Sequence, residues 1–296
     1  MKKTVLLTGA DGFLGSRLTA EFASQGWNVV GLVRNPSAKN IPPGLQDCFD
    51  YSIESGPSPE ALRISADVVI HGAFQTRGTA DAGAAAVNLR ASRLLADRYC
   101  RAHGALFVFI SSMSAHDNAV SHYGRSKREI ERSLDPAQSL AIRPGFIIGP
   151  GGIFQRLART LSSTRIAPMP YGGRLPIQTV DVTELCRAIL QLADARITGL
   201  YALGEARSIP IATFYSAIAA WMGKPITLIP VPGTPILHIA RLLERLGIPL
   251  PLTSENLLGL RGLIHHPVEP AMARIGWQPS VFSEILRRYD PSIVRG

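Results

Sequence analysis

The chain has 296 residues, 46% of them hydrophobic, which is enough to bury a large core in one big domain or two modest ones. The formal net charge is +9, but the 31 basic residues are scattered, with the densest cluster at 125–128. Such a basic surface suits phosphorylated small molecules and argues against a nucleic-acid partner. The three cysteines, Cys48, Cys100 and Cys186, lie far apart, which suits a reducing compartment and gives neither zinc-site spacing nor a disulfide framework.

The first residues resemble a signal peptide only superficially. Met1-Lys2-Lys3 precede an apolar run, but Gly9, Asp11 and Gly12 interrupt that run too early. No apolar stretch of about 18 residues follows that could cross a bilayer. The sequence therefore predicts a cytoplasmic protein with no membrane span and no metal site.

The stretch Val5–Gly15 reads VLLTGADGFLG, a short apolar run followed directly by a glycine turn and the start of a helical pattern. Gly9 permits a sharp exit from a strand, Gly12 lets a pyrophosphate approach the backbone, and Gly15 lets the helix pack close to the sheet. The helix N-terminus adds free N–H groups and a partial positive charge. This context favours a dinucleotide-binding turn over an ordinary glycine turn.

Strand and helix patterns alternate through the first half of the chain, as a parallel doubly wound sheet requires. The next predicted strand, Trp27–Val33, ends at Arg34, where NAD-specific folds carry an acid for the ribose hydroxyls. A guanidinium there suits a 2′-phosphate instead, so NADP is favoured over NAD. The further apolar runs are Asp67–Ile70, Leu106–Ile110 and Leu140–Ile142, with helices predicted at about 81–103 and 121–134.

From Pro144 onward the chain becomes rich in proline and glycine, as in PGFIIGPGG. We therefore predict a Rossmann-type doubly wound domain at 1–150 and a smaller, discontinuous substrate region at 151–296, with about 175–200 returning to the first domain. Asp181 and Glu184 indicate the start of a helix to about Ala193. The segment Ile236–Leu246 is apolar over a wide arc, which favours core packing over a substrate lid or a peripheral membrane contact.

Tyr123 and Lys127 are four residues apart, which places a phenol and an ammonium on one face of a helix. A free tyrosine has a pKa near ~10, so acid/base work at neutral pH needs nearby positive charge, which Lys127 and an oxidised nicotinamide can supply. Ser111 and Ser112 end the preceding strand, where one hydroxyl could bond the substrate oxygen. A surface pair and ordinary strand-end serines are the alternatives.

Together these residues resemble the extended short-chain dehydrogenase/reductase superfamily, in its branch of NAD-dependent epimerases, dehydratases and related reductases. The resemblance implies a catalytic trio of Ser112, Tyr123 and Lys127, with Ser112 preferred because it lies four residues before His116, where the family usually has a tyrosine. The cofactor-binding residues that follow from these motifs are Thr8, Gly9, Asp11, Gly12, Phe13, Leu14, Gly15, Arg34, Asp50, Tyr51, Ala73, Asn88, Tyr123 and Lys127. The Arg-Pro at 143–144 and the Gly-Trp-Gln-Pro at 276–279 match further family patterns.

The sequence also departs from this family. Ser112 and Tyr123 are only 11 positions apart, so the intervening loop is short. Met113 and Ser114 stand where dehydratases of the family have an Asp-Glu pair, and Ser114 where decarboxylases have Glu. Without those carboxylates, neither reaction has its acid/base. Epimerisation and carbonyl/alcohol redox remain.

We therefore expect an NAD(P)-dependent oxidoreductase or epimerase that moves hydride to or from a hydroxyl-bearing carbon of a small molecule. Arg174 lies seven residues before Asp181, as in sugar epimerases whose arginine grips the pyrophosphate, and this favours a nucleotide sugar as substrate. The alternatives are an NADPH-dependent carbonyl reductase of a more apolar substrate and a redox-silent dinucleotide-binding subunit. A homodimer is compatible with the sequence.

Overall fold

The computed structural model describes residues 2–36, 41–76, 82–101, 104–164, 166–248 and 253–294. Contacts divide the chain into two compact units. The first comprises Met1–Ser112, Ser126–Arg143 and Val182–Tyr201, and the second comprises the remaining segments.

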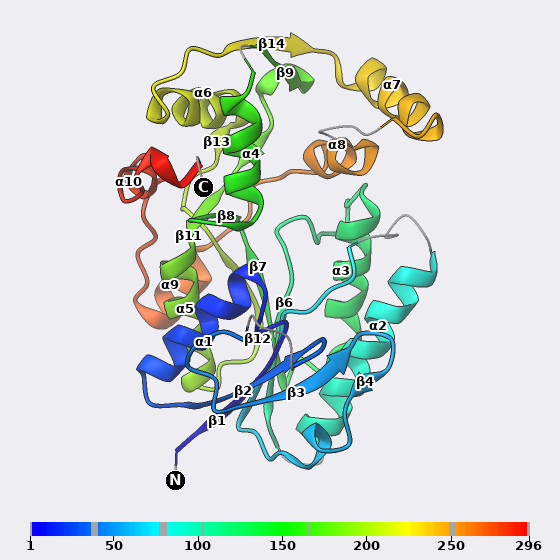
Figure 1. Ribbon diagram of the computed structural model, residues 1–296, viewed down its shortest axis with the longest axis vertical. Helices are drawn as coiled ribbons and strands as arrows, with labels where there is room; N and C mark the ends of the chain where they lie inside the picture. The colour runs from blue at the N-terminus through cyan, green and yellow to red at the C-terminus, as the bar shows by residue number, and fades with distance from the viewer. Residues whose placement is uncertain are drawn as a thin grey trace. The chain divides into compact units, whose positions relative to one another are not determined.

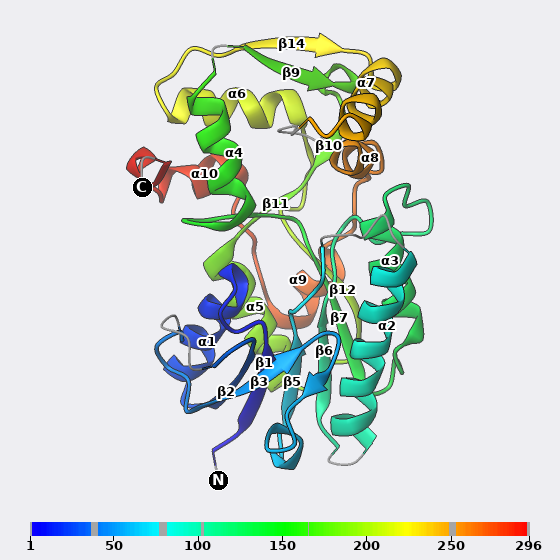
Figure 2. The ribbon, with the colours of Figure 1, turned by 45° about the vertical axis from the view of Figure 1, so that its right-hand side comes forward.

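The first unit is built on an eight-stranded sheet with the order β12-β7-β6-β5-β1-β2-β3-β4. The pairs from β3 across to β7 are parallel, and β4 pairs antiparallel with β3. Figures 1 and 2 both draw α2 and α3 on one face of this sheet and α1 and α5 on the other. The predicted doubly wound Rossmann-type sheet is thus confirmed.

The strands of this sheet are β1 (Thr4–Thr8), β2 (Asn28–Val33), β3 (Asp47–Ser52), β4 (Gly56–Pro57), β5 (Val68–His71), β6 (Leu106–Ile110), β7 (Ser139–Pro144) and β12 (Gly199–Leu203). The helices are α1 (Phe13–Ser24), α2 (Ala82–Ala96), α3 (His122–Ser133) and α5 (Val182–Asp194), with a 3-10 turn η1 (Ala61–Arg63) and a π-helical turn η2 (Asp97–Arg101).

The strand order reverses at β1. From β1 the sheet continues on one side through β2 and β3, and on the other side through β5, β6 and β7. Ligands of open parallel sheets bind at the carboxyl ends of the strands beside such a switch point. Gly15 allows α1 to approach here, because a Cβ on it would lie 2.0 Å from the carbonyl oxygen of Gly9. The glycine spacing read from the sequence therefore has a steric cause.

Sequence patterns located the central strands but not the sheet edge. β2, β5, β6 and β7 fall within two residues of the predicted runs. Strand β3 (Asp47–Ser52) was not predicted, because its DCFDYS pattern exposes Asp47 and Asp50 and lacks an apolar run. The helix predicted at about 81–103 ends at Ala96 and continues as the π-helical turn, while residues 81, 102 and 103 lie outside the described part of the chain.

The second unit consists of short two-stranded pairings and six helices among its described residues. β8 pairs parallel with β11, β9 parallel with β14, and β10 antiparallel with β13. Its largest core cluster centres on buried aromatic side chains, including Phe154, Phe214 and Phe282. A separate small cluster joins Leu237 and Ala240 to Leu257.

The strands of this unit are β8 (Phe146–Ile148), β9 (Ile166–Pro170), β10 (Pro176–Ile177), β11 (Thr179–Asp181), β13 (Ile209–Pro210) and β14 (Thr227–Val231). The helices are α4 (Gly152–Ser162), α6 (Ile211–Trp221), α7 (Gly233–Arg245), α8 (Ser254–Arg261), α9 (Glu269–Ile275) and α10 (Phe282–Arg287), with 3-10 turns η3 (Tyr171–Gly173) and η4 (Pro291–Val294).

Helix α7 corrects the expectation of core packing for Ile236–Leu246. Leu237 and Ala240 are buried, but Ile239, Leu242 and Leu246 are exposed. The apolar arc of this helix is wider than the face that packs against α8, so part of it remains uncovered.

Candidate active site

The carboxyl ends of β1 and β5 are joined by buried polar groups. The Thr8 hydroxyl accepts a hydrogen bond from the backbone N–H of Ala73 at 3.1 Å and lies 2.8 Å from Nδ1 of His71. Burial, reinforced by the charge of Lys127, lowers the pKa of His71 to about 3, so its ring is neutral at physiological pH and Nδ1 can accept the Thr8 proton. Thr8 and Ala73 therefore fix the turn after β5 beside the glycine turn.

The glycine turn and the start of α1, called the cradle below, are the predicted binding site for the pyrophosphate of a dinucleotide. Gly9 has φ 70° and Gly12 is the N-cap of α1. Within the fully described stretch 9–24, the N-cap makes no side-chain hydrogen bond and the first turn has no acidic residue. Because the N–H groups of Phe13, Leu14 and Gly15 lie in the first helical turn, they have no intrahelical acceptor. A side chain at position 12 would crowd this turn, because its Cβ would lie 3.1 Å from the carbonyl oxygen of Gly9. The geometry fits the pyrophosphate of a dinucleotide.

Asn88 organises the loop that follows β5. Its Oδ1 accepts the backbone N–H of Gln75 at 2.9 Å, and its Nδ2 donates to the carbonyls of Gln75 and Ala84 at 3.1 and 3.0 Å. The side chain is 2% exposed. Asn88 would therefore affect a bound cofactor by holding this loop in position.

Arg34, Asp50 and Tyr51 are further residues that the sequence predicts to bind the cofactor. Arg34 follows β2 and is exposed, as is Asp50 on β3. An oxygen of the Asp50 carboxylate accepts the N–H of Asn35, a non-glycine residue with φ 53°. Tyr51 differs, since its ring is 2% exposed and lies edge-on to His71. Asp11, the other acid of this region, is exposed in the glycine turn.

Helix α3 carries both Tyr123 and Lys127 and begins in the second unit before continuing in the first. Tyr123 is partly buried, and its backbone N–H donates to the Glu255 carboxylate of α8 at 3.0 Å. Lys127, one turn later, is 3% exposed. A four-residue step places the two side chains on the same helix face.

The ammonium of Lys127 is held by several groups of the first unit. Its Nζ donates to the carbonyl of Ile110 at 2.7 Å and lies over the rings of Phe74 and Phe109, at 4.0 and 4.6 Å from their centroids. Burial lowers the pKa of Lys127 to about 7, and the charge of Glu131 opposes that shift. The cation–π contacts and the carbonyl also favour the charged form. Lys127 can therefore carry its positive charge at neutral pH.

Glu131, one turn further along α3, was missed by the sequence reading. It forms a bidentate ion pair with Arg143, with Nε and Nη2 at 2.8 and 2.6 Å from its two oxygens. It also accepts the Ser111 hydroxyl at 2.6 Å. The step from Lys127 to Glu131, which continues the spacing from Tyr123, was the available signal.

The Glu131 contact separates the roles of the two serines. Because the single proton of the Ser111 hydroxyl is directed to Glu131, Ser111 braces the end of β6 against α3. Ser112, the next residue, is only partly buried. The choice of Ser112 as the hydroxyl that contacts substrate stays a prediction.

The loop between Ser112 and Tyr123 packs tightly against the start of α3. A Cβ on Gly124 would lie 2.3 Å from the carbonyl oxygen of Ser114. His116 in this loop is 7% exposed, and its Nε2 lies 2.6 Å from the carbonyl oxygen of Gly262. The glycine after Tyr123 is thus required by the close approach of the loop.

Arg174 and Asp181 have different surroundings in the second unit. Arg174 is exposed at the end of the η3 turn, where Tyr171 has φ 56°. Asp181 is 1% exposed and accepts the Tyr289 hydroxyl at 2.6 Å. Of the two residues at this seven-residue spacing, Arg174 is therefore an accessible cation and Asp181 is a buried, structural carboxylate.

A buried polar cluster in the second unit was also missed. Glu205 is 2% exposed and accepts the N–H and hydroxyl of Thr179 at 3.0 Å each. Burial raises the pKa of Glu205 while these hydrogen bonds oppose the rise. The Gln178 amide bridges the backbones of Glu205 and His266. No local motif marks these residues, because they come together only through tertiary structure.

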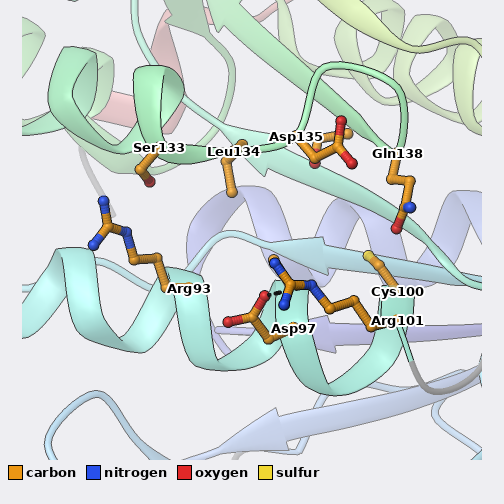
Figure 3. Close-up of a pocket in the computed structure, with 10 residues that line it drawn as sticks. Arg93, Asp97, Cys100, Arg101, Ser133, Leu134, Asp135 and Gln138 are labelled. Carbon is orange, nitrogen blue, oxygen red and sulfur yellow. Dashed lines mark ion pairs between the residues drawn. The ribbon is translucent and has the colours of Figure 1, made fainter.

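A cleft of about 350 Å³ lies elsewhere in the first unit (Figure 3). It is lined by the end of α2, the π-helical turn and the segment leading into β7, with an ion pair of 3.1 Å between Asp97 and Arg101. These segments precede β6 and β7, so the cleft lies at the amino ends of those strands. Thr8 and Ser112 follow the carboxyl ends, and the cleft is therefore separate from the candidate site.

Residues 1–231 match the family described as the RmlD substrate binding domain. The chain belongs to this family, within the short-chain dehydrogenase/reductase superfamily. The resemblance read from the motifs is thereby confirmed.

Among characterised relatives, the chain is similar to a ceramide reductase of Caulobacter vibrioides (strain NA1000 / CB15N), with 33% identity over 217 residues. That match covers 66% of each protein. An uncharacterised protein of Mycobacterium tuberculosis (strain ATCC 25618 / H37Rv) is 27% identical over 240 residues, or 79% of this chain and 24% of the relative. The chain thus spans just under two thirds of the first relative's length and about a quarter of the second's.

Solved structures of epimerases have the same fold. A UDP-glucose 4-epimerase of Thermus thermophilus, in complex with NAD, has a TM-score of 0.71 at 21% identity, covering 99% of each chain. An ADP-L-glycero-D-manno-heptose-6-epimerase of Helicobacter pylori has a TM-score of 0.70 at 17% identity, covering 99% of this chain and 96% of the other. At these identities the likeness shows the fold of this chain.

No group of three or more His, Cys, Asp or Glu side chains in the described ranges could hold a metal ion. Nor does any helix in that part of the chain have the length and apolar character to cross a membrane.

Proposed function

We propose that the chain is an NAD(P)(H)-dependent oxidoreductase that interconverts a ketone and a secondary alcohol on an apolar, lipid-like substrate. The observation that carries the chemistry is the buried Lys127, held by the Ile110 carbonyl one helical turn after Tyr123. Lys127 is 3% exposed and lies over two aromatic rings, whereas an ordinary surface lysine extends its ammonium into solvent.

The cradle around Gly9, Gly12 and the start of α1 would hold the pyrophosphate of the cofactor. When bound, the nicotinamide supplies or accepts the hydride. In the direction of reduction, the Tyr123 hydroxyl gives its proton to the substrate oxygen, while Ser112 orients that oxygen by a hydrogen bond. The positive charge of Lys127, one helical turn later on the same face, would stabilise the phenolate left on Tyr123.

The substrate class follows from the relative and from this chain's own residues. The ceramide reductase is 33% identical to this chain over 217 residues, whereas the two epimerase structures described above are 21% and 17% identical. Met113 and Ser114 provide no carboxylate beside Ser112 for elimination or decarboxylation chemistry. Carbonyl reduction needs only the proton donor, the orienting hydroxyl and the hydride.

For the cofactor, we propose NADP(H) over NAD(H). Arg34 directly follows β2 and is exposed, so its guanidinium can reach a 2′-phosphate. Asp50 is occupied by the N–H of Asn35, which reduces its availability to ribose hydroxyls.

A nucleotide sugar is the second candidate substrate, favoured by the exposed Arg174. Its guanidinium could bond two oxygens of a pyrophosphate. In that case the same Ser112, Tyr123 and Lys127 would oxidise and re-reduce a sugar carbon.

Nicotinamide absorbance during turnover tests the proposal. Purified protein is mixed with NADPH and either the ketone form of a ceramide in detergent micelles or a short water-soluble ketone, with Tyr123→Phe as the control variant. UDP-glucose is tested separately with the oxidised cofactor, and its epimerised product is measured by chromatography, because oxidation and re-reduction of a sugar carbon leave nicotinamide absorbance unchanged. Oxidation of NADPH with the long-chain ketone, absent in Tyr123→Phe, supports the proposal. Turnover of UDP-glucose alone, lost in Arg174→Ala, would assign the sugar substrate instead. Tight dinucleotide binding without turnover of any substrate would identify a redox-silent subunit.

A further inference from the structure

Helix α7 (Gly233–Arg245) presents a row of large apolar side chains to solvent. Ile239, Leu242 and Leu246 are 56%, 57% and 65% exposed. Their spacing of three and four residues aligns them along one side of the helix. Single exposed apolar residues are ordinary on protein surfaces, but an aligned row calls for a partner.

The outward row is not produced by a loosely attached helix. On another side of α7, Leu237 and Ala240 pack against Leu257 of α8. The Glu244 carboxylate accepts both the N–H and the hydroxyl of Ser254 at 2.6 Å each. These contacts fix the orientation of α7 about its own axis, so the exposed apolar row cannot turn inward without breaking them.

A row of cations runs beside the apolar row. His238, Arg241 and Arg245 are exposed and also repeat at three- and four-residue steps. At 100° per residue they lie roughly 40–100° around the helix from Leu242, on the side toward Leu237. The basic row therefore lies between the packed face of α7 and its exposed apolar row.

The apolar surface extends beyond α7 at the same end of the second unit. Ile229 on β14 is 43% exposed, and Ile166 on the paired strand β9 is 55% exposed. Strand β14 leads directly into α7, and Figures 1 and 2 both draw β9, β14 and α7 at one end of this unit.

We propose that α7 docks the protein on an anionic lipid surface, with Ile239, Leu242 and Leu246 inserted at the headgroup boundary and Arg241 and Arg245 on lipid phosphates. A helix that combines an apolar row with a basic flank lies in the plane of the interface. A second copy of this chain fits less well, because Glu244 is the one acid of α7 and it already bonds Ser254. Two facing copies would bring basic rows together, whereas anionic headgroups neutralise them.

Vesicle co-sedimentation of the full chain tests this proposal without any substrate, so it succeeds or fails independently of the proposed reduction. The vesicles contain phosphatidylcholine alone or with about one third phosphatidylglycerol. The test variant is Leu242→Asp/Leu246→Asp, which puts charges into the apolar row. The matched control is Ile153→Asp, because Ile153 is 63% exposed on α4 but lies outside this surface.

We expect wild type and Ile153→Asp to bind the anionic vesicles alike, and the double variant to bind at least about a hundredfold more weakly, since each leucine contributes roughly tenfold. Arg241→Ser/Arg245→Ser should lose most of the preference for phosphatidylglycerol and most of the salt sensitivity. Absence of wild-type binding, or equal binding by the double variant, would overturn the proposal. So would concentration-dependent self-association, measured by sedimentation velocity, that the double variant abolishes while vesicle binding is unaffected. Circular dichroism checks that each variant is folded.

Discussion

Helices α3 and α7 have nearly the same length but opposite relations between polarity and burial. In α3, Lys127 is 3% exposed and the Glu131 side chain 2% exposed, each with hydrogen-bonding or ionic partners. In α7, Ile239 and Leu242 are more than half exposed. Ordinary folding would place these side chain types the other way round.

Under the two proposals above, each inversion marks a place where function rather than stability selects the residue. Buried charges cost desolvation energy, so α3 retains them only because Ile110, Arg143 and the aromatic rings compensate. Exposed apolar residues on α7 forgo burial energy unless another surface covers them. The comparison predicts that changes on α3 affect chemistry and stability, while changes on α7 affect association.

The largest expected effect is on turnover, from Tyr123→Phe. Removing the hydroxyl takes away the proton donor while the ring can still pack, so kcat should fall by about 10²–10⁴-fold. Fluorescence titration should show nearly unchanged dinucleotide affinity. Turnover close to wild type would remove Tyr123 from the mechanism and leave the buried Lys127 without a chemical role.

The next effect is on stability, from Glu131→Gln. This change leaves Arg143, whose side chain is 10% exposed, without its bidentate partner, and should lower the free energy of unfolding by about 3 kcal/mol. The matched control is Arg128→Gln, because Arg128 pairs with the same carboxylate at 3.3 Å but is 25% exposed, and should cost less than about 1 kcal/mol. Equal costs from urea denaturation would contradict the compensation inferred for α3.

The sequence alone was sufficient to predict features that depend on residues close together in the chain. The spacing of Gly9, Gly12 and Gly15 predicted the strand–turn–helix junction because it follows from local sterics, and the four-residue step from Tyr123 to Lys127 placed both on one helix. The Glu131–Arg143 pair joins a helix to the following strand, and only a continued four-residue spacing hinted at it.

Long-range structure explains what the sequence could not predict. The cluster of Gln178, Glu205 and His266 depends on contacts between residues up to 88 positions apart. The exposure of α7 was unpredictable for a related reason, since an apolar arc shows which residues could be buried but not whether a partner is present. Assignments of the candidate site, including Ser112, Arg34 and Arg174, stay predictions.

A third prediction concerns acid stability and His71. Its pKa of about 3 in the folded chain lies below its ordinary value of 6.5, so the unfolded chain binds more protons between these pH values. Stability should therefore fall as pH drops through this window, by up to about 1.4 kcal/mol per pH unit from this group. In His71→Asn the slope of unfolding free energy against pH should be shallower by that amount. Parallel urea-unfolding slopes from pH 4.5 to 6.5 would show that burial of His71 is not the cause.

A smaller effect is expected at Arg34, which is exposed directly after β2. Arg34→Ala should weaken NADPH binding by about tenfold and leave NADH binding nearly unchanged, since a solvated charge-assisted pair contributes modestly. The ratio of the two dissociation constants, measured at low and high salt, is the readout. Equal loss for both cofactors would indicate that Arg34 contacts the shared part of the dinucleotide.

The smallest effect on stability is expected at Leu242, and it tests the α7 side of the comparison. Leu242 is 57% exposed, so Leu242→Ala should change the free energy of unfolding by less than about 0.5 kcal/mol. Ile130 on α3 is fully buried, and Ile130→Ala should cost about 2–5 kcal/mol. Urea denaturation of both variants in the absence of lipid gives the two numbers. A cost above about 2 kcal/mol at Leu242 would mean that this side chain is covered within the protein itself, and the outward apolar row would then have no surface to offer a membrane.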